Sequence, residues 1–205
     1  MHLIIQMGNP SGNSIDSKQL TTLPKVILYT NKLCISVDEV AKTFDKYKTR
    51  IEIMDESKMF KTLFISYGGP DQEVAKSLND KLKSKGIHTW FFPDNAKLGE
   101  KLHRMMSNGV NNHDHVLLIC SKNSLSRVGV LNEIERVLER EAKEGGGDIL
   151  LPVTIDEFVF SNWAPEKIDI SDQIRSRVIT PVDMTDANID STIDKIVDVL
   201  KKQQG

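Results

Sequence analysis

This sequence of 205 residues has little cysteine and no long apolar run. Its two cysteines, Cys34 and Cys120, lie far apart and form no CxxC pair, which favours a reduced, intracellular protein. No run approaches the roughly 20 apolar residues that a membrane span needs. The apolar stretch at residues 1–6 is too short for a signal peptide. These absences predict a soluble, cytoplasmic protein without a membrane partner.

The chain also lacks an excess of charge of either sign. Its 27 basic and 29 acidic residues are interleaved and give a net charge of -2. No global field therefore attracts nucleic acid or an anionic membrane, and neither a GxGxxG nor a Walker motif is present. With 39% hydrophobic residues the chain can bury a core, and its length allows one ordinary domain plus an extension.

The first 58 residues predict a small ordered unit of the β-α-β type. Residues 2–6, 25–30 and 50–54 have strand patterns, and residues 8–17 are rich in Gly, Asn, Ser and Pro, as in a loop. A capping box at Ser36 and Glu39 opens a helix expected to reach about residue 47. We interpret residues 1–58 as an N-terminal extension of unknown role.

From residue 61 onward, apolar strands alternate regularly with amphipathic helices. We expect strands at 62–67, 87–92, 115–120, 149–154 and 178–181, and helices at 72–85, 101–110, 129–143 and 187–202. This alternation predicts a parallel sheet covered by helices on both faces. Ligands bind such sheets at the carboxyl ends of the strands, which here are followed by residues 66–71, 93–100 and 121–128.

Several segments, in this order and at these spacings, resemble the TIR domain of the bacterial type. They are Phe64-Ile-Ser-Tyr67 with Asp71, Trp90-Phe-Phe-Pro-Asp94, Ala96-Lys-Leu-Gly99, Val116-Leu-Leu-Ile119 with Ser121, Ser124-Leu-Ser126, Asn132-Glu133-Ile-Glu135 and Pro152-Val153. The resemblance covers about residues 61–201. It implies a flavodoxin-like α/β fold with a sheet of about five parallel strands, in a TIR domain that we place at residues 59–205.

One position departs from the pattern. Many members of the family have tryptophan four residues before the glutamate, where this chain has Gly129. The change removes an aromatic wall from the expected pocket, which Val128 or Trp90 would have to replace. It bears on turnover and on the pose of a substrate more than on the fold.

The resemblance implies two alternative functions. Bacterial and plant TIR domains often cleave NAD⁺ into nicotinamide and ADP-ribose or a cyclic isomer, frequently in antiphage or immune signalling. Animal receptor and adaptor TIR domains are mostly non-catalytic scaffolds, and both kinds self-associate. We favour the NAD⁺ hydrolase, with other signalling or defence proteins as further partners. A nucleoside deoxyribosyltransferase-like enzyme, also α/β with a catalytic glutamate, is a third alternative that the Ser124 to Glu133 spacing disfavours.

Glu133 is the candidate catalytic residue. Nicotinamide leaves a cationic ring as a neutral molecule and needs no general acid, whereas ordinary O-glycosidases need two carboxylates. One carboxylate can orient the ribose and stabilise oxocarbenium charge. The alternative interpretation is a solvated glutamate on a helix surface that also carries Glu135, Glu139 and Glu141.

The expected nucleotide contacts come from three segments. After the first strand, small residues allow close approach to the backbone, although the same segment also fits a plain turn. An aromatic residue of the second strand would stack on a base or on nicotinamide unless it packs in the core. Two basic residues would pair with the pyrophosphate unless they are only solvated. The residues are Phe64, Ser66, Tyr67, Gly68 and Gly69, then Trp90 and Phe91, then Lys97 and Arg104.

No bound cofactor or metal is expected, because NAD⁺ is the substrate. The triplet His113-Asp114-His115 precedes a buried strand but has neither the spacing nor the partner cluster of a metal site. We also expect activity to depend on self-association, since the loop at residues 93–100 is both a pocket wall and an exposed segment.

Overall fold

The computed structural model describes residues 4–7, 25–30, 50–55, 59–96, 98–161, 163–184 and 186–201. The chain divides into two compact units, Met1–Met59 and Phe60–Gly205. In the first unit, β1 (Ile4–Met7) pairs antiparallel with β2 (Lys25–Thr30), which pairs parallel with β3 (Arg50–Asp55). The helix predicted at residues 37–47 lies outside the described residues.

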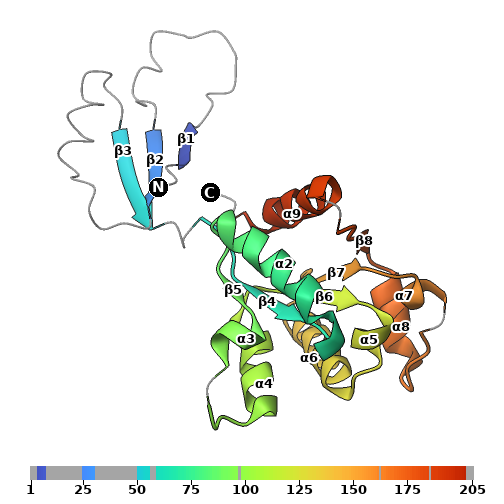
Figure 1. The fold of residues 1–205 in the computed structure, drawn as a ribbon. Coiled ribbons are helices and arrows are strands. Elements are labelled where there is room, and N and C mark those ends of the chain that lie inside the picture. Colours follow the sequence, from blue (N-terminus) through green and yellow to red (C-terminus); the bar gives the residue numbers. More distant parts are fainter. Residues whose placement is uncertain are drawn as a thin grey trace. The chain divides into compact units, whose positions relative to one another are not determined.

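The second unit is built on a five-stranded sheet in which every neighbouring pair of strands is parallel, as predicted. The strand order is β5-β4-β6-β7-β8 (Figure 1). The strands are β4 (Leu63–Ser66), β5 (Thr89–Trp90), β6 (His115–Cys120), β7 (Leu150–Thr154) and β8 (Thr180–Pro181).

Helices lie on both faces of this sheet (Figure 1). The longer ones are α2 (Gln72–Ser84), α4 (Leu102–Asn112), α6 (Val128–Lys143), α8 (Ile168–Arg175) and α9 (Asp186–Leu200). The short ones are the 3-10 turn η2 (Gly69–Asp71), α3 (Phe92–Asn95), α5 (Lys122–Leu125) and α7 (Phe158–Ser161). No helix in the described parts of the chain is long and apolar enough to cross a membrane.

The alternation of side chains along each strand divides the core into two layers. Phe64, Val116 and Leu118 pack in one cluster with residues of α4 and α6. The intervening residues Ile65 and Leu117 are fully buried outside that cluster. On that opposite face α2 and α9 contact each other. Because Ser66 follows Phe64 by two residues, its side chain faces the α6 layer.

Several segments differ from the sequence prediction, and α7 and α8 form where no helix was predicted. The second strand is confined to Thr89–Trp90 instead of residues 87–92, and α3 forms where a loop was expected. The side chain of Asn95 accepts a hydrogen bond of 2.9 Å from the backbone N–H of Phe91, which withdraws this group from the sheet. Residues 121–128 contain α5 because Ser121 caps it, accepting a 3.0 Å hydrogen bond from the N–H of Ser124.

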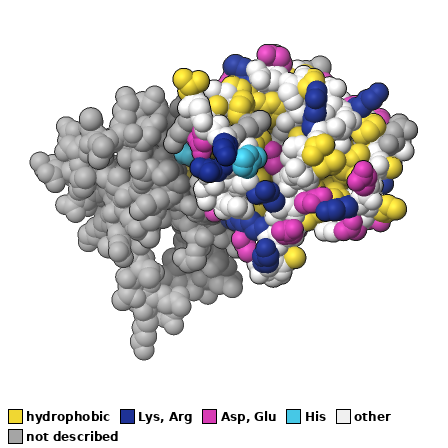
Figure 2. All heavy atoms as spheres, turned by 90° about the horizontal axis from the view of Figure 1, so that it is seen from below, with side chains coloured by type: hydrophobic (Ala, Val, Ile, Leu, Met, Phe, Trp, Pro, Cys, Tyr) yellow, Lys and Arg dark blue, Asp and Glu magenta, His cyan; other side chains and the backbone are white. Residues whose placement is uncertain are grey.

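The face shown in Figure 2 carries basic and acidic side chains interleaved with hydrophobic ones, without a large region of one sign. This agrees with the net charge of -2.

Candidate active site

A cavity of about 380 Å³ lies at the carboxyl end of β4, between the segment after that strand, α4 and the beginning of α6. This is where ligands bind parallel sheets. The residues that line it are Tyr67, Gly68, Gly69, His103, Met106, Ser107, Arg127, Gly129, Val130, Asn132, Glu133 and Arg136. A neighbouring hollow of about 610 Å³ between α4 and α6 shares Asn132 and Arg136 with it but does not include Glu133.

In the part of the chain that the structure describes, Glu133 is the only carboxylate that lines this cavity. Its side chain is 4% exposed, because α6 turns the face that carries Val130, Ile134 and Val137 toward the sheet. Ser66, at the end of β4, donates a hydrogen bond of 2.5 Å to its Oε2. The glutamate is therefore held in one place by a rigid strand and is not a solvated residue of the helix surface.

Burial governs the charge of this carboxyl group. Desolvation raises the pKa of Glu133 from its ordinary value of 4.5 to about 7, while the hydrogen bond from Ser66 and the positive charge of Arg136 act in the opposite direction. Near neutral pH Glu133 is thus partly protonated and partly ionised. A cationic ligand beside Glu133 favours the ionised form.

The wall of the cavity at Gly68 is fixed by a polar network around Asp71. The buried carboxylate of Asp71 accepts hydrogen bonds from the hydroxyls of Ser121 (2.5 Å) and Ser124 (2.6 Å). The hydroxyl of Ser124 in turn accepts one of 2.7 Å from the backbone N–H of Gly68. A Cβ atom at Gly68 would lie 2.8 Å from the carbonyl oxygen of Asn123, so only glycine allows this approach.

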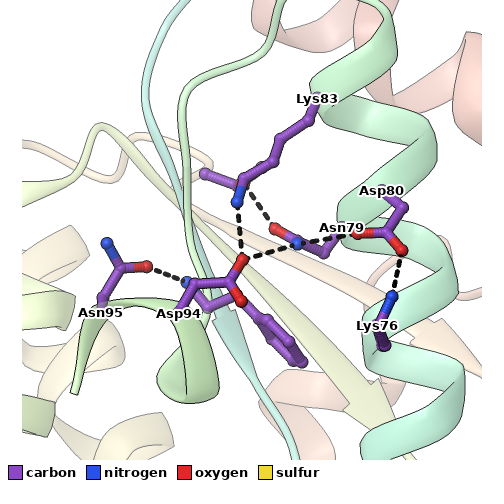
Figure 3. Close-up of polar contacts among 8 residues, drawn as sticks. Lys76, Asn79, Asp80, Lys83, Asp94 and Asn95 are labelled. Atoms are coloured by element: carbon purple, nitrogen blue, oxygen red, sulfur yellow. Dashed lines mark hydrogen bonds and ion pairs between the residues drawn. The ribbon is translucent and has the colours of Figure 1, made fainter.

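The segment after β4 also contacts the beginning of α3 through Tyr67. The ring of Tyr67 stacks on the buried ring of Phe91, with 5.6 Å between the ring centroids. The pKa of Tyr67 rises to about 12, through burial and the negative charge of Asp94, so its hydroxyl stays neutral. Asp94 is tied to α2 by Lys83 (2.7 Å) and Asn79 (3.3 Å), as Figure 3 shows.

The structure brings together five of the residues that the sequence predicts for the site. Glu133, Tyr67, Gly68 and Gly69 line the cavity, and Ser66 contacts Glu133 directly. Lys97 lies outside the described residues.

Other predicted contacts belong elsewhere, which corrects the expectation. Phe64 is fully buried, stacked on Trp90 with 4.9 Å between the ring centroids, and Phe91 is 2% exposed beneath Tyr67. Phe64 and Phe91 are core residues, and the ring of Phe64 packs against Gly109 of α4. Trp90 does not line the cavity, and neither does Arg104, which is exposed on α4.

Sequence reasoning missed the basic residues of the cavity, namely His103, Arg127 and Arg136. A signal was present: Arg127 immediately precedes α6, and Arg136 follows Glu133 by one helical turn, so both flank the candidate carboxylate on one helix.

The space left by Gly129 is not filled by the residues suggested as substitutes. Gly129 lines the cavity, and a Cβ atom there would meet nothing within 4 Å. Val128 is 72% exposed and lines a different hollow, and Trp90 packs against the core. The cavity is therefore open on this side.

The fold agrees with comparisons to known proteins. The family model of the TIR domain matches residues 63–197. The chain belongs to the TIR domain family. It is also similar to the NAD(+) hydrolase TcpA of Theionarchaea archaeon (strain DG-70-1), at 27% identity over 92 residues. That match covers 44% of this chain and 27% of TcpA, so the chain spans about a quarter of the length of this relative.

Two solved TIR structures share the fold. The TIR domains of the activated Roq1 resistosome, which directly recognises the pathogen effector XopQ, match with a TM-score of 0.54 and 18% identity, over 68% of this chain and 98% of that chain. The TIR domain of the Toll-related receptor TRR-2 from Hydra magnipapillata matches with a TM-score of 0.50 and 13% identity, over 68% and 96%. At these identities the likeness concerns the fold alone.

Proposed function

We propose that this TIR protein is an NAD⁺ hydrolase in which Glu133 is the catalytic carboxylate. The observation that carries the proposal is the burial of Glu133 in the cavity at the carboxyl end of β4, held by Ser66 at 2.5 Å. The similarity to an archaeal NAD(+) hydrolase supports this activity within the family. NAD⁺ is the substrate, and the reaction as proposed needs no resident cofactor or metal.

In the proposed reaction the bond between C1′ of the ribose and the ring nitrogen of nicotinamide breaks. The electron pair goes to the pyridinium nitrogen, and nicotinamide leaves as a neutral molecule. Ionised Glu133 stabilises the positive charge that develops on the ribose. Water then bonds to C1′ and releases a proton, giving ADP-ribose; attack by a nitrogen of the adenine instead gives a cyclic isomer.

Residues of the segment at the end of β4 have supporting roles in this proposal. The backbone at Gly68 and Gly69 allows a nucleotide to approach closely. The neutral hydroxyl of Tyr67 offers a hydrogen bond, and Ser66 holds the orientation of Glu133.

The test is nicotinamide release from NAD⁺ by the full-length wild type and by Glu133→Gln. The substitution keeps the shape and removes the charge, so we expect a folded protein with activity reduced by at least ~100-fold. Glu135→Gln is the matched control, since Glu135 lies on α6 outside the cavity and pairs with Lys167 at 2.8 Å. Equal turnover in Glu133→Gln and the wild type would remove Glu133 from the mechanism.

The same assay addresses self-association, which we also propose to be required. The described residues of the loop at 93–100 do not line the cavity, contrary to the sequence expectation. If a neighbouring molecule brings this loop onto the cavity, the competent state is rare in the monomer, and apparent affinity falls by that fraction. Specific activity should then rise with protein concentration. A flat profile for a protein that is monomeric throughout would reject this requirement and leave the role of Glu133 intact.

A non-catalytic scaffold that acts by homotypic association is the alternative function. The open wall at Gly129 favours it, because a bound ribose would lack the aromatic contact that many family members provide. Under this alternative the wild type releases no nicotinamide at any concentration but still self-associates. For the enzyme we propose a cytoplasmic role in antiphage or immune signalling, with other defence proteins as partners. Protection of cells against phage by the wild type, and its loss in Glu133→Gln, tests that role.

A further inference from the structure

The candidate cavity contains more positive than negative charge. Among the described residues that line it, the basic ones are His103, Arg127 and Arg136, and Glu133 is the only carboxylate. The two guanidinium groups thus outnumber the single carboxyl group of the cavity. A cavity with these charges favours a ligand that has a negatively charged part in addition to the part that lies beside Glu133.

Both arginines are available for a ligand. Among the described residues, the side chain of Arg127 makes no hydrogen bond or ion pair, and Arg136 hydrogen-bonds only to the hydroxyl of Ser107. Two other arginines are already paired with carboxylates: Arg140 pairs with Glu144 at 2.7 Å, and Arg177 pairs with Glu141 at 2.5 Å. Arginine residues that line a cavity without a carboxylate partner are suited to bind phosphate groups.

The spacing along α6 places the two charges on either side of Glu133. Arg136 follows Glu133 by three residues, and such side chains are neighbours on the helix surface. Arg127 precedes Glu133 by six residues, about 9 Å along the helix axis. In a dinucleotide the pyrophosphate is attached through C5′ to the ribose whose C1′ carries the nicotinamide. A ribose beside Glu133 therefore brings the phosphates within reach of long arginine side chains.

We propose that Arg127 and Arg136 bind the pyrophosphate of the nucleotide and make the site selective for dinucleotides over nucleosides. This inference deepens the proposed NAD⁺ hydrolase function and rests on it for the identity of the substrate. It transfers the role that the sequence suggested for Lys97 and Arg104 to the N-cap residue of α6 and a residue within that helix. Both act as specificity residues that hold the substrate and are not involved in breaking the glycosidic bond.

The first measurement is calorimetric binding of ADP-ribose to the full-length wild type, Arg127→Gln and Arg136→Gln. Loss of one charge-assisted phosphate contact should raise the Kd about 10- to 100-fold in each variant. Lys122→Gln is the control, because Lys122 is exposed on the nearby α5 and does not line the cavity. Its Kd should change less than about twofold, as expected for a surface charge.

The second measurement compares two substrates. Nicotinamide riboside has the scissile bond but no phosphate, so Arg127→Gln should cleave it with the kcat/KM of the wild type. Arg136→Gln also removes a charge that lowers the pKa of Glu133, so its loss of kcat/KM with nicotinamide riboside should be much smaller than its loss with NAD⁺. With NAD⁺ the same variants should lose about 10- to 100-fold in kcat/KM. A merely structural role of the arginines would instead reduce turnover of both substrates alike.

The outcomes separate this inference from the proposed function. Wild-type affinity for ADP-ribose in either arginine variant overturns the assignment of that arginine, even if the protein cleaves NAD⁺. If only Arg104→Gln raises the Kd for ADP-ribose, the phosphates bind at Arg104, as the sequence suggested, and the proposal is overturned. Absence of ADP-ribose binding by the wild type overturns it as well. Binding that depends on both arginines without any cleavage of NAD⁺ supports the phosphate site and rejects the hydrolase.

Discussion

Replacing Glu133 by glutamine should make the ligand-free protein more stable at alkaline pH. The pKa of Glu133 is about 7 in the folded protein, against an ordinary value of 4.5. Below pH 4.5 the carboxyl group is protonated in both the folded and the unfolded chain. Between about pH 4.5 and 7 the carboxyl group ionises in the unfolded chain but stays largely protonated in the folded protein, so the folded protein loses relative stability across this range.

The size of the effect follows from the two pKa values. A carboxyl group with these values costs about 3 kcal/mol of folding free energy once the pH exceeds both. Glu133 is 4% exposed, so solvent screening does not reduce this figure much. Glutamine keeps the shape and can still accept the hydrogen bond from Ser66, but it never ionises. The variant should therefore gain up to ~3 kcal/mol over the wild type at pH 8 and little at pH 4.

Urea unfolding of both proteins at pH 4, 6 and 8 measures this difference directly. Titratable groups common to both proteins contribute equally to each. The informative quantity is therefore the pH dependence of the difference in unfolding free energy between the variant and the wild type. In thermal melts at pH 8 the gain corresponds to a rise in Tm of about 6 to 12 °C for a chain of this size. Glu135→Gln is the control; it removes only a surface ion pair and should lose at most ~1 kcal/mol. A difference in unfolding free energy between the variant and the wild type that stays constant from pH 4 to pH 8 would refute the reasoning.

Two further substitutions test the packing around the cavity. Gly109→Ala should destabilise the protein by about 1–3 kcal/mol in urea unfolding, because the added methyl overlaps the buried ring of Phe64. This loss is expected although alanine is the better helix former. Gly129→Ala, which adds its methyl in open space on α6, is the control and should cost no stability. Gly129→Trp should fold normally and raise nicotinamide release several-fold by closing the open wall; unchanged turnover in this variant would mean that the missing tryptophan does not limit the site.

The fold was accessible from the sequence because its signals are local. The apolar run at β6 and the helical periodicity of α6 both follow from burial on a regular element, and the structure confirms them. The family pattern added the order of these elements. The second strand was predicted too long because the hydrogen bond from Phe91 to Asn95 competes with the sheet, and such a competition is decided by only one side chain.

The sequence by itself also singled out Glu133, through its distance from the segment around Ser124 in a familiar pattern. Whether that glutamate is a surface residue or a buried one was decided by the tertiary structure, which places Ser66 against it from a strand 67 positions earlier. The same holds for the aromatic and basic residues. Trp90, Phe91 and Arg104 looked equally suited to bind a nucleotide, but packing buries the first two to different degrees and leaves the third outside the cavity. Composition and spacing determine which elements form, because those forces act along the chain. Which side chains converge on one cavity depends on how distant elements pack, and only the folded structure settles that.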